Sequence, residues 1–97
     1  MKKNISIIGC GAIGSELALS VDRMMMETVT ISSFLDIKLE NAETLKSKLS
    51  NNNPIIFNNF TEYIESESLK NVDLVVETAS QNALINYLNP IILLKKN

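Results

Sequence analysis

The sequence predicts one α/β domain built on a parallel β-sheet, and three observations predict it. Short apolar segments alternate with segments of helical spacing, in the order β-α-β-α-β-α-β-α, which is typical of parallel strands joined by right-handed crossovers. The chain has 97 residues, enough for one domain, and 45% of them are hydrophobic, which is ordinary for a protein with a buried core. All three glycines lie at the first junction between a strand and a helix.

That junction carries a nucleotide-binding pattern. The apolar run Ile5–Ile8 predicts a buried strand, and residues 12–25 predict a helix. The pattern G-x-G-x-x-G follows this strand and extends into the first turn of the helix. It is formed by Gly9, Cys10, Gly11, Ala12, Ile13 and Gly14. A strand, this pattern and a helix form the dinucleotide-binding fingerprint; a glycine turn that only joins the two elements is the alternative. We expect Gly9 to turn the chain, Gly11 to admit a pyrophosphate and Gly14 to let the helix pack closely.

The first helix carries apolar residues at helical spacing, namely Ile13, Leu17, Ala18, Val21 and Met24. We interpret Met24-Met25-Met26 as core filler at its end, with a partner surface as the alternative. Residues 28–34 are rich in β-branched side chains and predict the second strand. Residues 40–49 predict the second helix, which the turn before Pro54 ends.

The second half of the chain continues the alternation. Residues 55–57 predict a short third strand, and Thr61 is expected to cap a short helix that packs Tyr63 and Ile64 inward. Residues 71–76 predict a fourth strand, whose apolar end indicates burial on both faces. Ser80 is expected to cap a helix over residues 81–88.

Asp36 is the second candidate for a binding role. It lies at the end of the second strand, 22 positions after Gly14. Nucleotide-binding units place an acidic residue at about this spacing, where it accepts hydrogen bonds from the adenosine ribose. A carboxylate there repels a 2′-phosphate, so we expect NAD as the cofactor. Lys38 can reach a 2′-phosphate, so NADP stays open as a second cofactor.

The end of the fourth strand is the other expected part of the site. In open α/β sheets ligands bind beyond the carboxyl ends of the strands, where the strand order reverses. The run after that strand is Glu77-Thr78-Ala79-Ser80-Gln81. Its small residues would let the nicotinamide ribose lie against the backbone. For Glu77 two interpretations remain open: a catalytic acid, or an acidic residue that orders the loop.

Composition excludes several kinds of function. The net charge is −2 and the pI is about 5.0, which argues against a nucleic-acid partner. The chain has no histidine and one cysteine, so we expect no metal site. No stretch is long and apolar enough to cross a membrane, and glycines break the apolar run after Met1 too early for a signal peptide. We therefore expect a cytoplasmic protein that does not bind membranes.

Together these motifs resemble the N-terminal NAD(P)-binding domain of L-aspartate dehydrogenases. The resemblance rests on the glycine pattern, on Asp36, on Ala42-Glu43 in the following helix, and above all on Val75-Val76-Glu77-Thr78-Ala79-Ser80-Gln81. It implies a Rossmann-like, doubly wound sheet in the order 3-2-1-4, seen here up to the fourth strand and the following helix. It also implies that residues 9–14 hold the pyrophosphate, Asp36 the adenosine ribose, and Ala79 with Ser80 the nicotinamide side.

The resemblance implies an oxidoreductase of cytoplasmic NAD biosynthesis that acts on an amino-acid CH–NH2 group. Such enzymes convert L-aspartate and NAD(P)+ to iminoaspartate, which yields oxaloacetate and ammonia. Their substrate domain and catalytic histidine follow in a C-terminal half. We expect residues 1–97 to be the dinucleotide-binding domain, inactive alone, with the substrate domain absent from this chain. The family often has Arg where this chain has Ile37, which weakens the case for NADP.

Two other functions and one association stay open. A non-catalytic NAD(H)-sensing module, or the first domain of another dehydrogenase such as a homoserine dehydrogenase relative, would show the same motifs. The fourth strand would form an apolar edge of the sheet, and such edges pair with other chains. We therefore expect either a piece of a longer enzyme or a domain that forms homo-oligomers through this edge.

Overall fold

The computed structural model describes residues 2–78, which form a four-stranded parallel sheet with helices on both faces. The elements, in chain order, are β1 (Lys3–Ile8), α1 (Ala12–Met24), β2 (Val29–Leu35), α2 (Leu39–Lys48), β3 (Ile55–Phe57), α3 (Phe60–Glu65), α4 (Glu67–Lys70) and β4 (Leu74–Glu77). The strand order is β3-β2-β1-β4. This confirms the predicted α/β class and the Rossmann-like order 3-2-1-4. The helix expected over residues 81–88, with Ser80 as its cap, lies outside the described residues.

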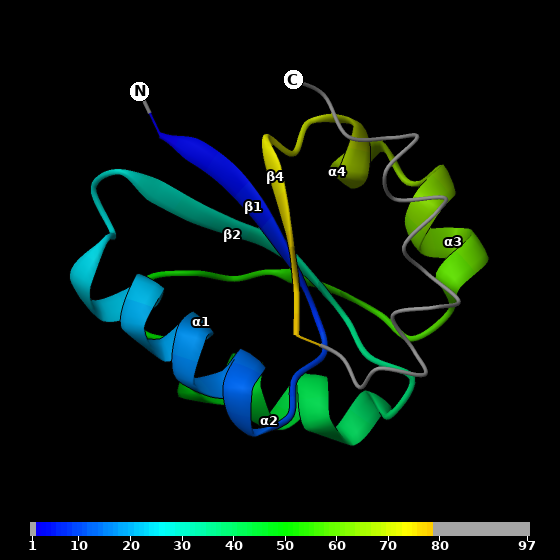
Figure 1. The fold of residues 1–97 in the computed structure, drawn as a ribbon, viewed down its shortest axis with the longest axis horizontal. Coiled ribbons are helices and arrows are strands. Elements are labelled where there is room, and N and C mark those ends of the chain that lie inside the picture. The colour runs from blue at the N-terminus through cyan, green and yellow to red at the C-terminus, as the bar shows by residue number, and fades with distance from the viewer. Residues whose placement is uncertain (1, 79–97) are drawn as a thin grey trace.

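The helices divide between the two faces of the sheet. Figure 1 shows α1 and α2 on one side and α3 and α4 on the other. Side chains from alternate strand positions therefore enter two separate cores: Ile7 and Phe34 pack with the first pair of helices, and Ile8 and Leu35 pack with the second. The change of face follows from the strand order, because the crossover to β4 runs in the opposite direction from those to β2 and β3. The carboxyl ends of β1 and β4 thus border the point where the order reverses.

β2 contains one residue more than regular pairing with β1 requires. Ile5 lies opposite Ile31, but Ser6 lies opposite Ser33, so the register shifts by one residue at Ser32. Because of this bulge, Ser33 lies on the same face of the sheet as Ser6 and not on that of Ile31. The two hydroxyl oxygens are 2.7 Å apart. The Ser6 hydroxyl is also 2.7 Å from that of Tyr63 on α3, which ties the centre of the sheet to this helix.

The third helix begins one residue before the expected cap. Thr61 lies inside α3, and the cap is Asn59, whose side chain accepts a hydrogen bond from the Glu62 N–H at 3.0 Å. Asn is a strong capping residue, and here it lies three positions before a free backbone donor. The prediction that Tyr63 packs inward is confirmed, since it is fully buried, whereas Ile64 is half-buried.

Two expectations about burial are wrong. Met24, Met25 and Met26 do not fill the core, because 81%, 44% and 42% of their surfaces are exposed. Met24 is the last residue of α1, and all three methionines follow the last buried residues of that helix, Val21 and Asp22. β4 begins at Leu74 rather than residue 71 and is not buried on both faces, because Leu74 is 46% exposed. Within residues 2–78 no helix is long and apolar enough to cross a bilayer.

Candidate functional site

The turn between β1 and α1 lies at the carboxyl edge of the sheet. Gly9 has a φ of 93°, a conformation that L side chains rarely adopt, so the expected turn at this glycine is present. Its N–H donates to the Leu35 carbonyl at 2.8 Å, which holds the turn against the end of β2. The chain therefore reverses into α1 directly above the sheet.

Gly11 and Gly14 differ in the space around them. A Cβ placed on Gly11 would meet no atom within 4 Å, so this glycine faces open space. A Cβ on Gly14 would collide with the Gly9 carbonyl oxygen and lie 2.6 Å from the Thr78 hydroxyl oxygen. Gly14 is thus required for the packing of α1 on the turn, whereas the absence of a side chain on Gly11 leaves room for a ligand.

The N-terminus of α1 has no built-in anion. Its cap residue is Gly11, which has no side chain to accept a hydrogen bond, and its first turn contains no acidic residue. The Ser15 hydroxyl donates to the Cys10 carbonyl at 3.1 Å, away from the first free amides. Such a helix end presents N–H groups and the positive end of the helix dipole, which favours phosphate binding.

The structure brings Asp36 to this turn. One carboxylate oxygen accepts from the Cys10 N–H at 2.8 Å, and the other accepts from the Lys38 N–H at 2.9 Å. The Asp36 N–H donates to the Phe57 carbonyl at 3.0 Å, so the backbone is fixed as well. Each carboxylate oxygen can accept more than one hydrogen bond. Asp36 therefore retains acceptor capacity for a ligand while its orientation is set by two backbone donors.

Cys10 contributes its backbone rather than its thiol. The side chain is 4% exposed, and burial together with the neighbouring Asp36 carboxylate raises the pKa of the thiol to about 12. The group therefore stays protonated at neutral pH and is a poor nucleophile. Its N–H is donated to Asp36, so we do not expect that N–H to hold a phosphate.

Thr78 connects the end of β4 to the glycine turn. Its backbone N–H donates to the Ile8 carbonyl at 2.8 Å. Its hydroxyl lies 2.9 Å from the same carbonyl oxygen and 2.8 Å from that of Gly9. The sequence places the run that contains Thr78 at the site but assigns this residue no role of its own. The only signal was a β-branched hydroxyl residue among small ones directly after an apolar strand.

Glu77 lies beside this contact, opposite Ile8 in the register of β1 and β4. Both carboxyl oxygens are shielded from solvent, and neither has a hydrogen-bond partner in the described part of the chain. Burial raises the pKa of this carboxyl group above its ordinary value. Burial also raises the pKa of Tyr63 to about 12; the Ser6 hydrogen bond lowers it, and the Glu77 charge adds to the rise. Glu77 thus approaches the buried hydroxyl cluster of Ser6, Ser33 and Tyr63.

Two further side chains expose apolar surface near this edge. Ile13 in the first turn of α1 and Ile37 after Asp36 are each 69% exposed. The structure therefore gathers Gly9, Cys10, Gly11, Gly14 and Asp36 at one place, with Ala12 and Ile13 in the same helix turn. Ala79 and Ser80, the expected nicotinamide side, lie outside residues 2–78.

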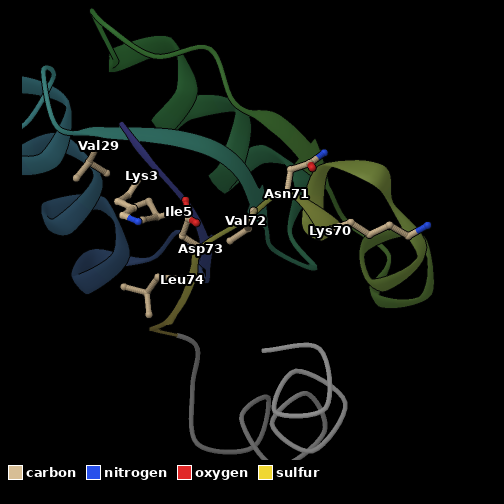
Figure 2. A pocket seen from close by; sticks show the side chains of 8 residues that line it. All are labelled: Lys3, Ile5, Val29, Lys70, Asn71, Val72, Asp73 and Leu74. Carbon is tan, nitrogen blue, oxygen red and sulfur yellow. The ribbon is translucent and has the colours of Figure 1, made fainter. Parts of the chain in front are cut away.

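A separate hollow lies at the opposite, amino edge of the sheet. It measures about 580 Å³ and is lined by Lys3, Ile5, Val29, Lys70, Asn71, Val72, Asp73 and Leu74. Figure 2 shows the Lys70 side chain extending away from the other lining residues. Lys70 is paired with Glu67 at 3.1 Å. Among residues 2–78 no cluster of acidic, cysteine or histidine side chains is suited to a metal ion.

Comparison with known proteins agrees with the fold and with an NAD-binding domain. Residues 9–97 match the family model described as "Homoserine dehydrogenase, NAD binding domain". L-aspartate dehydrogenase of Methanococcoides burtonii is 39% identical over 80 residues, and that of Nitrosopumilus maritimus is 33% identical over 82 residues. The matches cover 82% and 84% of this chain but 27% and 28% of those proteins. The chain thus spans about a quarter of the length of these relatives.

Solved structures show the same fold at low sequence identity. A myo-inositol dehydrogenase from Lactobacillus casei, in complex with NAD(H), superposes with a TM-score of 0.73 at 18% identity. The superposed region covers 93% of this chain and 25% of the myo-inositol dehydrogenase chain. A scyllo-inositol dehydrogenase from the same organism, also with NAD(H), superposes with a TM-score of 0.79 at 13% identity. The superposed region covers 100% of this chain and 27% of that enzyme's chain.

Proposed function

Because the chain belongs to the family of homoserine dehydrogenase NAD-binding domains, we propose that residues 1–97 form the cofactor domain of an NAD-dependent oxidoreductase. Its role is to hold the dinucleotide at the carboxyl edge of the sheet while a substrate domain supplies the rest of the active site. The cofactor, when bound, accepts or donates a hydride. This chain has no histidine to serve as a proton-transfer base, so we expect no catalysis by these 97 residues alone.

The geometry of the three glycines and Asp36 carries this proposal. Open space at Gly11, close packing at Gly14 and a helix without an acidic first turn fit a pyrophosphate at residues 9–14. Asp36 lies against the same turn, where its carboxylate accepts a hydrogen bond from the Cys10 N–H. A ribose that follows the pyrophosphate would lie at this place. We assign the pyrophosphate to residues 9–14, the adenosine ribose to Asp36, and the nicotinamide ribose to Ala79 and Ser80.

L-aspartate is the substrate that the relatives support best. Two proteins named L-aspartate dehydrogenase match four-fifths of the chain, including the run through Glu77. In that reaction the Cα hydrogen of L-aspartate leaves as hydride to NAD+, giving iminoaspartate, NADH and a proton. Water then converts the imine to oxaloacetate and ammonia, or the imine enters NAD biosynthesis in the cytoplasm. We propose this activity for the protein of which residues 1–97 form the cofactor domain.

NAD is proposed as the preferred cofactor over NADP. The Asp36 carboxylate is held by two backbone donors and would face the 2′ position of the ribose. Ile37 follows it and offers an apolar side chain, which cannot pair with a phosphate. Lys38 lies two positions after Asp36 and carries a cationic side chain, and its own N–H is tied to Asp36. NADP binding is therefore proposed to be weaker and not absent.

The outer edge of β4 is proposed as a place of strand pairing. Within the described residues β4 pairs with β1 alone, and the exposed Leu74 begins this strand. Unpaired strand edges readily accept another strand. The relatives are longer than this chain, so we propose that a further part of the same protein pairs with this edge. Pairing with a second copy of the chain is the alternative. Light scattering of the 97-residue chain that shows only monomers at high concentration would exclude the second copy.

A homoserine dehydrogenase relative remains a candidate because the matching family model carries that description. A non-catalytic NAD(H)-sensing module is the candidate from another class. Genomic sequence beyond Asn97 separates them: a histidine-bearing domain in the same reading frame favours the enzyme, and a stop codon favours the module.

Titration with NADH and NADPH, followed by nicotinamide fluorescence, tests the proposed function. Saturable binding with NADH preferred is the expected result. Binding of neither cofactor, by a chain whose circular dichroism shows a folded α/β protein, would refute a functional cofactor site in these residues.

A further inference from the structure

One peptide group connects the two halves of the candidate site. The carbonyl oxygen of Gly9 is 2.8 Å from the Thr78 hydroxyl at the end of β4. The N–H of Cys10, in the same peptide, donates to Asp36 after β2 at 2.8 Å. In a planar trans peptide the C=O and N–H bonds point in opposite directions, so fixing one of them fixes the other. The Gly9–Cys10 peptide is thus held from both sides by residues 42 positions apart in the sequence.

Thr78 holds its side of this peptide through a shared proton. A hydroxyl group has one hydrogen, and here it is shared between the carbonyl oxygens of Ile8 at 2.9 Å and Gly9 at 2.8 Å. The backbone N–H of Thr78 also donates to Ile8, at 2.8 Å, which fixes the distance between β4 and the turn. The Ile8 carbonyl would keep this second donor if the hydroxyl were removed. Of the two carbonyls, that of Gly9 therefore depends more on the side chain of Thr78.

The position of Gly9 makes its carbonyl sensitive to the loss of a partner. Gly9 has a φ of 93° and no side chain to restrict rotation of its peptide groups. The residue is buried, and its carbonyl oxygen lies against Gly14 of α1. A buried carbonyl without a partner is costly, so it is expected to turn toward another donor or toward water. Such a rotation would carry the Cys10 N–H away from Asp36.

We propose that Thr78 is a positioning residue for cofactor discrimination: its hydroxyl orients the Gly9–Cys10 peptide, and the N–H of that peptide orients the Asp36 carboxylate. This inference rests on the proposed binding of the adenosine ribose by Asp36. With both carboxylate oxygens held by backbone donors, Asp36 cannot turn aside for a 2′-phosphate. Loss of the Thr78 hydroxyl releases one of these two donors.

Four variants isolate the hydroxyl of Thr78. Thr78→Val keeps the branched shape without the hydroxyl, and Thr78→Ala removes the hydroxyl without adding a methyl group beside the Gly9 carbonyl. Thr78→Ser keeps the hydroxyl and is the rescue variant. Thr61→Val makes the same chemical change at an exposed position on α3. A purely structural role of Thr78 would lower stability without changing which cofactor the folded protein prefers.

The first measurement is the dissociation constant of each variant for NADH and for NADPH, well below its unfolding temperature. For Thr78→Val and Thr78→Ala we expect about tenfold weaker NADH binding, and a NADH preference over NADPH that falls by about fivefold. Thr78→Ser and Thr61→Val are expected to remain within about twofold of the original protein. An unchanged NADH preference in both hydroxyl-free variants would overturn the proposal.

The second measurement needs no cofactor. In an amide NMR spectrum of the full chain, the Cys10 N–H should resonate downfield, because it donates to a carboxylate. Asp36→Asn should move this resonance upfield, and so should Thr78→Val and Thr78→Ala, whereas Thr78→Ser should not. If only Asp36→Asn moves it, the connection from Thr78 to Asp36 is wrong. If the chain binds neither cofactor, the proposed function fails, and this spectrum still decides whether the connection exists.

Discussion

The Asp22 carboxylate in α1 accepts a hydrogen bond from the side-chain amide of Asn52, 30 residues later, at 2.9 Å. The N–H groups of Ser50 and Asn51 also donate to this carboxylate, at 2.7 and 2.9 Å. The other end of the Asn52 side chain accepts from the Ile31 N–H at 2.8 Å. Asp22 is 1% exposed, so this buried charge depends on its donors. The contact fixes the loop between α2 and β3 against both α1 and β2.

Acid should weaken this contact and with it the fold. Burial opposes ionisation of Asp22, but the hydrogen bonds from Ser50, Asn52 and Asn51 outweigh it and lower the pKa below 3.8. A carboxyl group whose pKa is lower in the folded state stabilises the fold above its unfolded pKa, and this stabilisation is lost as the pH falls through the folded pKa. Unfolding free energy measured between pH 7 and pH 2 should therefore fall more steeply below about pH 4 than for Asp22→Asn.

At neutral pH Asp22→Asn should cost about 2 kcal/mol of unfolding free energy, because an amide cannot accept from all three donors. Glu43→Gln, at an exposed position on α2, is the matched control and should change the unfolding free energy by less than about 0.5 kcal/mol. Equal stability of Asp22→Asn and Glu43→Gln in urea would contradict a stabilising role of this contact.

Gly11 and Gly14 should respond differently to an added side chain. At Gly11, a Cβ would meet no atom, but Val is a poorer helix cap than Gly, so Gly11→Val should lower stability by only about 1 kcal/mol while NADH binding weakens by more than about a hundredfold. Gly14→Ala forces a methyl group against the Gly9 carbonyl and should cost at least about 3 kcal/mol. Urea unfolding and NADH titration of both variants check this. Normal NADH binding by Gly11→Val would show that the pyrophosphate lies elsewhere.

Removal of the Asp36 carboxylate should reduce the preference for NADH. Asp36→Ala loses the proposed acceptor for the ribose hydroxyls, so NADH affinity should fall by about tenfold or more. NADPH affinity should fall less, because repulsion of the 2′-phosphate is removed at the same time. Competition between the two cofactors on one protein sample measures the ratio directly. A ratio equal to that of the original protein would exclude Asp36 from ribose recognition.

Glu77 should make the fold less stable as the pH rises. Its pKa in the folded state is raised by burial above 4.5, so folding favours the protonated form. The unfolding free energy should therefore decrease as the pH rises from the unfolded pKa to the folded pKa, and above it the buried charge remains a cost. Glu77→Gln should abolish this decrease and be more stable at pH 7. Parallel pH profiles for Glu77→Gln and the original chain would refute it.

The hydroxyl cluster under the sheet should contribute to stability and not to cofactor binding. Tyr63→Phe removes a 2.7 Å hydrogen bond with Ser6 but keeps the edge-to-face contact with Phe57, whose ring centre is 5.5 Å away. We expect a loss of about 1 kcal/mol in unfolding free energy, with the NADH dissociation constant unchanged within about twofold. A large change in NADH affinity would show that this cluster reaches the site.

The local motifs of the fold were predictable, and the contacts between distant segments were not. The glycine pattern identifies the turn because it depends on a few adjacent residues, and the spacing of 22 positions to Asp36 matches one strand–helix–strand unit. Alternation of apolar residues located the strands, but the bulge at Ser32 shifts which side chains of β2 face which core. Periodicity cannot reveal such a shift, because the extra residue is left unpaired and the alternation continues from the next residue with the faces exchanged.

The parts that sequence reasoning missed depend on side chains that meet across the fold. Thr78 reaches the Gly9 carbonyl across 69 positions, and the local sequence shows a hydroxyl residue after the strand but not the groups that it contacts. Asn59 and Thr61 are both suitable helix caps. The choice between them depends on the residue at which the helical backbone begins, which is Phe60. The exposure of Met24 could not be read from spacing, because Met24 continues the apolar spacing of α1 although the last buried residues of the helix are Val21 and Asp22.

The extra residue in β2 also bears on how this chain can change in length. Residues 33–35 keep regular pairing with β1 on the carboxyl side of Ser32, and Asp36 follows them directly. A deletion of Ser32 would restore uniform pairing and leave those residues on the same faces. This strand can therefore lose one residue in evolution or by design without moving the carboxylate, whereas a deletion between residue 33 and Asp36 would reverse the faces of the strand.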